Sequence, residues 1–153
     1  MDVFFYWKDF DKDMKAGRIG YLASERKKMA DMRLDYPDYI WAFRTPKGQK
    51  GLLELVARLK WSDSAAVPVP KLGNKSVIYY DPAHADSQLF TDAGTEEQLA
   101  EISSLIRREF PKAFAANFQG DHAVQAMRGD FLRQFRRVAE GYASQPFKEG
   151  VPV

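Results

Sequence analysis

The chain has 153 residues, of which 45% are apolar, 29% charged and 14% aromatic, with a formal net charge of +2. We expect one domain over residues 1–153, with a barrel core over about 1–110 and a helical extension over about 111–153. No run approaches the ~18 apolar residues of a membrane span, and the start lacks a signal-peptide pattern, so no membrane partner is expected. The absence of cysteine excludes disulfides and thiolate metal sites and favours a cytoplasmic protein.

Positive charge is concentrated in the first half of the chain. Residues 1–80 contain 15 Lys and Arg against 10 Asp and Glu, whereas residues 81–153 contain 8 against 11. A basic segment rich in aromatic residues is compatible with a polyanionic partner. A bias of this size is equally compatible with an ordinary solvated surface.

The first forty residues predict two short extended segments and two short helices. The apolar run 3–7 predicts a buried strand, and a helical turn follows through Met14 to residue 16. Residues 20–24 read as a brief extended piece. Ser24 is the expected N-cap of a basic helix over 25–33 that carries Met29 and Met32 on one face.

Residues 39–61 predict a hairpin of two long strands joined by a basic turn, because both arms are rich in aromatic and β-branched residues. The first arm is apolar nearly throughout. In the second arm, alternation places Leu53, Leu55, Ala57 and Leu59 on one side and charged residues on the other. We therefore expect this hairpin to form the core of a sheet.

The second half of the chain predicts a loop, two strands and two helices. The Pro- and Gly-containing segment 62–74 reads as a loop, and residues 76–80 and about 88–90 read as strands. Thr95 and Gln98 form a capping box that opens a helix ending before Pro111. A second long helix is expected from Asp121 to Tyr142, followed by a loose tail from residue 144.

No residue constellation in the sequence supports catalysis or metal binding. His84 and His122 have no second ligand at metal spacing, so each is read as a surface residue. The segment 9–13 imitates a calcium loop, but Met14 and Gly20 occupy positions that require Gly and an acidic residue. We expect a non-enzymatic protein with no cofactor.

Aromatic residues at predicted strand ends alternate with basic residues. Aromatic faces stack on bases for ~1–3 kcal/mol each, and basic groups contact phosphates. Most of these rings are expected to be core, but Trp7 and Trp61 lie at strand ends and are expected to be partly open.

The order of segments resembles the YTH and EVE domains of the PUA-like superfamily. The residues that carry the resemblance are the aromatic strand ending in Lys8, Asp13, the segment 20–24, the strand 51–57 and the helix opening at Thr95. It covers about residues 3–61 and 95–106. The resemblance implies an α+β, PUA-like mixed β-barrel with flanking helices that receives a modified or flipped base in a pocket.

In YTH and EVE domains, pocket residues follow the first strand, and Lys8 and Asp9 occupy the matching positions here. Ser24 lies on the segment that in those domains follows a tryptophan of the pocket. That tryptophan is Leu22 here, so Tyr21, Trp7 or Trp61 would have to supply the missing ring. The hypothesis is therefore a binding module for DNA or RNA. Its base pocket is formed by Trp7, Lys8, Asp9, Tyr21, Ser24 and Trp61, and its phosphate contacts are Arg18, Arg26, Lys27, Lys47 and Lys50.

The alternative is a protein-interaction module. In that interpretation the arginine-lined C-terminal helix uses Phe131 and Phe135 to dock a partner or to form a homodimer.

Overall fold

A computed structural model of the chain describes residues 1–24, 27–65 and 68–149. Within them the strands are β1 (Asp2–Tyr6), β2 (Tyr21–Ser24), β3 (Tyr39–Arg44), β4 (Glu54–Ser62), β5 (Ser76–Asp81), β6 (Gln88–Phe90), β7 (Val124–Met127) and β8 (Ser144–Pro146). The helices are α1 (Phe10–Lys15), α2 (Lys27–Asp31), α3 (Glu96–Glu109), α4 (Pro111–Ala115) and α5 (Gly129–Ala139). Short 3₁₀ turns cover Met32–Asp35, Gly120–Ala123 and Phe147–Glu149.

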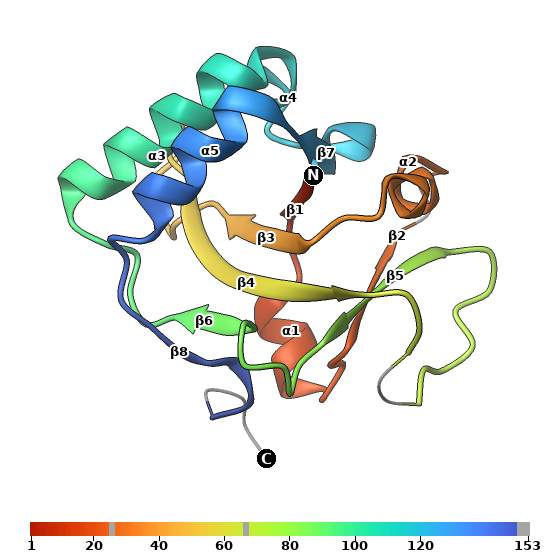
Figure 1. Cartoon of the computed structure of the whole chain (residues 1–153). Helices are drawn as coiled ribbons and strands as arrows, with labels where there is room; N and C mark the ends of the chain where they lie inside the picture. The colour runs from red at the N-terminus through yellow and green to blue at the C-terminus, as the bar shows by residue number, and fades with distance from the viewer. Residues whose placement is uncertain (25–26, 66–67, 150–153) are drawn as a thin grey trace.

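The strands form one curled sheet that makes a half-barrel. The order along its main path is β2-β5-β4-β3-β1-β7, and β6 joins β4 to β8. Strands β1 and β3 run parallel, whereas the other pairs are antiparallel. Helices α3 and α5 lie side by side against one face, as Figure 1 shows. The expected α+β class with a curved sheet is confirmed.

Both faces of the central strands are buried, which explains the nearly continuous apolar runs of β1 and β3. Ile40 and Ala42 face a first core inside the curl, whereas Trp41 and Phe43 face a second core beneath α3 and α5. The same alternation distributes the side chains of β1. The sheet is therefore the middle layer of the molecule.

A bulge in β4 changes the expected alternation of the hairpin. The register passes from Ala42 opposite Ala57 to Phe43 opposite Leu55, so Val56 is the extra residue. Leu55 therefore faces the helices, while Ala57 faces the inner core. The expectation that Leu53, Leu55, Ala57 and Leu59 share one side was wrong, because a bulge shifts the phase of a strand by one residue.

The long helix expected from Asp121 to Tyr142 is confirmed over Gly129–Ala139, where α5 lies, and is wrong before Gly129. Residues 124–127 instead form β7, which pairs with the free edge of β1. Arg128 is extended and Gly129 has a φ of 61°, a conformation that suits glycine and separates β7 from α5. Pairing with the edge of β1 outweighs the helical pattern in the sequence.

Residues 144–149, the described part of the tail that was expected to be loose, are ordered. Strand β8 pairs with β6, and the backbone N–H of Phe147 donates to the carbonyl oxygen of Ser87 at 2.8 Å. The Phe147 side chain is fully buried and its ring lies edge-on to Tyr80. The tail thus closes one end of the inner core.

The two N-terminal helices differ in their limits from the expected ones. Helix α1 starts at Phe10, four residues before the expected turn. Ser24, the expected N-cap, is the last residue of β2, and residues 25–26 lie outside the described residues. Met29 and Met32 are buried as expected.

Candidate functional site

A small hollow lies between the end of β1 and strand β2, with a volume of about 160 Å³. We call it the seam hollow. Its lining residues are Phe5, Tyr6, Trp7, Lys8, Asp9, Asp13, Leu22, Ala23, Ser24 and Ala123. Four of the six predicted pocket residues, Trp7, Lys8, Asp9 and Ser24, are therefore brought together from two separate segments.

The fold positions these two segments in different ways. The chain beyond β1 is held by Trp7, whose backbone N–H donates to the carbonyl oxygen of Phe43 at 2.7 Å. Strand β2 lies at one end of the strand order and, among the described strands, pairs only with β5. The terminal strand of a sheet presents backbone N–H and C=O groups along its outer edge. The seam hollow therefore has a wall that includes strand backbone.

Trp7 is a buried wall of the hollow and not an open stacking surface. Its side chain is 2% exposed, and its Nε1–H donates to Oδ2 of Asp13 at 2.8 Å. Its ring lies edge-on to Phe10 and Tyr80. The expectation that Trp7 is partly open was wrong, because α1 and the inner core cover the indole.

Trp61 and Tyr21 do not line the seam hollow. Trp61 is 8% exposed in the inner core, on the same side of β4 as Ala57 and Leu59, and its Nε1–H donates to Asp63. The expectation of a partly open Trp61 was therefore wrong as well. Tyr21 borders a different hollow that it shares with Arg18 and with Pro68 and Pro70 of the long loop.

Lys8 lines both the seam hollow and a second hollow of about 370 Å³, which lies beside the turn between β3 and β4. We call this second one the turn hollow. Lys47 lines it together with Arg44, whose guanidinium forms ion pairs with Glu54 and Asp11. Lys8 and Lys47 therefore place two lysines along the path from the seam hollow to the turn hollow, among acidic residues that line the same hollows: Asp9, Asp11, Asp13 and Glu54.

The other predicted phosphate contacts do not line either hollow in the part of the chain that the structure describes. Lys50 is exposed on the hairpin turn but does not line the turn hollow. Arg18 forms an exposed ion pair with Asp13 at 3.4 Å. Lys27 is the first residue of α2, and Arg26 lies outside the described residues.

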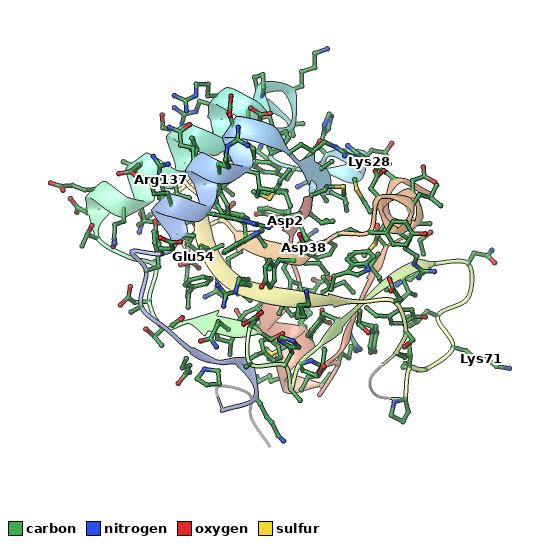
Figure 2. All side chains as sticks on the ribbon, in the orientation of Figure 1. Asp2, Lys28, Asp38, Glu54, Lys71 and Arg137 are labelled. Atoms are coloured by element: carbon green, nitrogen blue, oxygen red, sulfur yellow. The ribbon has the colours of Figure 1, made fainter. Side chains whose placement is uncertain are left out.

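Lys28 is a basic residue near the seam hollow that the sequence analysis did not single out. Its Nζ donates to Oε1 of Gln125 at 3.0 Å, and Figure 2 shows it between α2 and β7. Burial lowers the pKa of Lys28, and the negative charge of Asp121 partly offsets this effect. Gln125 and Asp121 flank Ala123, which lines the seam hollow. The basic run 26–28 was the available signal.

The residues of the alternative interface are buried in this chain. Phe131 is 9% exposed and Phe135 is fully buried, and both belong to the core beneath α3 and α5. A partner cannot dock on these two rings, so the alternative was wrong about them. Homodimer formation stays a prediction without an assigned surface.

Among the described residues, no three His, Asp or Glu side chains are grouped so as to hold a metal ion. Within the same residues, every helix is too short or too polar to cross a bilayer. A comparison with protein-family models, curated proteins and solved structures finds no match for this chain.

Proposed function

We propose that this protein is a non-enzymatic nucleic-acid-binding module of the PUA-like kind, and that the seam hollow receives one unstacked base. The observation that carries the proposal is the grouping of Trp7, Lys8, Asp9 and Ser24 around one hollow. The resemblance to YTH and EVE domains implies a pocket formed by these same two segments. The curled sheet with flanking helices is compatible with that fold.

The chemistry of the hollow suits recognition of a base edge better than stacking. Leu22 and Ala23 provide an aliphatic wall, whereas Lys8, Asp9 and Ser24 provide charged and hydroxyl groups. A base taken out of its stack is recognised by hydrogen bonds to its exposed edge together with apolar contacts. Since the Trp7 face is covered, we expect an aliphatic and polar pocket in place of an aromatic cage.

The basic residues around the hollow provide the phosphate contacts in this proposal. Lys8 borders both hollows, Lys47 lines the turn hollow, and Lys28 lies beside β7. A phosphate near Lys28 would compensate a charge that burial disfavours. We expect binding to weaken steeply with salt, because phosphate contacts release counterions.

The test measures binding of single-stranded DNA and RNA by fluorescence anisotropy over a salt series. Each is used unmodified and with a methylated base, such as N6-methyladenine. Lys8→Ala should weaken binding and reduce the salt slope by about 1. Lys71→Ala is the matched control, because Lys71 is exposed and projects from the loop between β4 and β5 (Figure 2).

A second variant separates base recognition from phosphate contact. Ala23→Leu fills the seam hollow, so it should abolish any preference among bases while the salt-dependent binding remains. Circular dichroism verifies that each variant is folded. Failure of the unmodified chain to bind any oligonucleotide at low salt would overturn the proposal.

A further inference from the structure

A different hollow, which combines aromatic rings with guanidinium groups, lies between the end of α5 and strands β3, β4 and β6. Its volume is about 300 Å³. We call it the arginine hollow. Four rings and two guanidinium groups line it, from Tyr39, Trp41, Phe90, Tyr142, Arg58 and Arg136. Of the described lining residues, none is shared with the seam hollow.

A buried carboxylate fixes the orientation of Arg136. The Nε and Nη2 atoms of Arg136 donate to the two oxygens of Asp2 at 3.0 and 2.8 Å, and the Asp2 side chain is fully buried. The Trp41 Nε1–H donates to the same carboxylate at 2.7 Å. Asp2 thus takes two of the five N–H donors of Arg136. Asp2 therefore orients the guanidinium, and Nη2 of Arg136 also lies 3.8 Å from Oδ2 of the exposed Asp38.

Arg58 is held beside it by a carbonyl oxygen and by aromatic faces. Its Nε donates to the backbone oxygen of Asp86 at 2.8 Å, and its guanidinium carbon lies 5.3 Å from the Tyr39 ring centroid. Arg136 lies over the same ring at 5.7 Å. Two guanidinium groups are therefore gathered around Tyr39. Their planar donor forks suit bidentate binding of a carboxylate or phosphate.

The other residues that line the arginine hollow suit the planar, apolar ring of a ligand. The Trp41 and Phe90 rings are nearly parallel, with centroids 6.5 Å apart, and Tyr142 lies edge-on to Phe90. Tyr39 and Phe90 are partly exposed. Glu140 is the acidic residue among the described lining residues. The Asp2 and Asp38 carboxylates also pair with Arg136, and the Asp86 carboxylate accepts from the Tyr39 hydroxyl, so an anionic ligand would share the two guanidinium groups with these acids.

We propose that the arginine hollow binds a small aromatic anion, a planar ring that carries a phosphate or a carboxylate. The anionic group binds Arg58 and Arg136, and the ring lies against Tyr39 and Phe90. The volume is at the lower end of the range for small-molecule pockets, which fits a ligand of this size. The site is independent of the seam hollow, so each can fail without the other.

The test is isothermal titration of the full chain with four probes. Adenosine monophosphate and indole-3-carboxylate represent the phosphate and carboxylate sources, while adenosine and inorganic phosphate supply the ring or the anion alone. We expect at least one aromatic anion to bind about tenfold or more tightly than adenosine and inorganic phosphate. If neither aromatic anion binds in the millimolar range, the proposal is overturned.

Arg58→Gln should weaken binding of the aromatic anion by about tenfold, because it removes one guanidinium group and its paired N–H donors. Arg137→Gln is the matched control, since Arg137 is exposed on α5 and is not among the lining residues. Equal affinity of Arg58→Gln and the unmodified chain would overturn the proposal.

The unmodified chain also provides a test that needs no variant. Side-chain NMR signals of Trp41 and Tyr142 should shift on addition of the aromatic anion, while those of Trp7 and Trp61 stay in place. Shifts at Trp7 and Trp61 without shifts at Trp41 and Tyr142 would place the ligand elsewhere and overturn the assignment.

Discussion

Asp2 and Arg136 are 134 positions apart in the sequence and are joined by two hydrogen bonds between one carboxylate and one guanidinium. This ion pair ties the first strand to α5, and Figure 2 shows Asp2 beneath that helix. Trp41 of the neighbouring strand donates to the same carboxylate. One buried acid therefore connects β1, β3 and α5 and also orients a residue of the arginine hollow.

Replacing Asp2 with Asn should destabilise the fold by roughly 2–3 kcal/mol. The amide keeps one acceptor for Trp41 but loses the charge that pairs with Arg136, and breaking one partner of a buried ion pair costs more than a surface pair contributes. The estimate stays below the usual range for fully buried pairs because the Arg136 side chain is 40% exposed. Urea unfolding followed by tryptophan fluorescence measures the change.

Arg137→Gln is the control for this prediction, because its exposed side chain leaves the Asp2 pair intact. It should change the free energy of unfolding by no more than about 0.5 kcal/mol. An Asp2→Asn protein as stable as the unmodified chain would contradict the assigned role of the ion pair.

Much of the sheet could be predicted from the sequence because its central strands are long and strongly patterned. The segments 39–61 and 76–80 carry enough β-branched and aromatic residues to exclude other assignments. The segment 124–127 does not, since Val124 and Met127 fit a helical face as well as a short strand. Its pairing with β1 depends on a partner more than 100 residues away, which local patterns cannot reveal.

The candidate site was predictable in part for a related reason. Lys8, Asp9 and Ser24 lie beside segments that the apolar pattern predicted as extended, and the resemblance to YTH and EVE domains, rather than a predicted strand order, implied that they share one pocket. The burial of Trp7 and Trp61 was not predicted, because it depends on the packing of α1 and of the inner core around these rings, which a position at the end of a strand does not reveal. The arginine hollow combines Arg58 and Arg136 from segments that no sequence spacing connects.

Thr95→Ala should lower the stability of the fold by about 1 kcal/mol. The Thr95 hydroxyl accepts from the backbone N–H of Gln98 at 3.1 Å, and the Gln98 side chain accepts from the backbone N–H of Thr95 at 2.8 Å. Alanine removes the first of these bonds and leaves a donor of the first turn of α3 without its cap. Thermal unfolding compares Thr95→Ala with Thr95→Ser, which retains the hydroxyl and should stay close to the unmodified chain.

Stability should fall as the pH rises from about 10 to about 12. Burial, together with the negative charges of Glu101 and Asp92, raises the pKa of Tyr142 to about 12. An unfolded tyrosine has a pKa near 10, so the unfolded chain loses this proton first and alkaline pH favours unfolding. The contribution is complete below pH ~10 and is lost as the pH passes the folded value.

Absorbance of tyrosinate during a pH titration measures this effect, with urea unfolding at each pH. Burial raises the pKa of Tyr39 and of Tyr80 in the same direction, so both add to the slope. Tyr142→Phe should reduce the loss of stability between pH 10 and 12 without abolishing it. A slope unchanged in Tyr142→Phe would show that Tyr142 ionises normally in the folded protein.

Phe147→Ala should destabilise the fold by about 3 kcal/mol, as removal of a fully buried phenyl ring leaves a cavity in the inner core. The ring lies 5.5 Å from that of Tyr80, and the backbone of Phe147 is anchored to Ser87. Lys148→Ala, at the exposed neighbouring position, is the matched control and should leave the free energy of unfolding nearly unchanged. Chemical unfolding measures both variants, and hydrogen exchange at Thr91, whose backbone N–H donates to the carbonyl oxygen of Ala143 at 3.1 Å, reports separately on the contact between the ends of β6 and β8. Equal stability of the two variants would mean that the C-terminal segment does not close the inner core in solution.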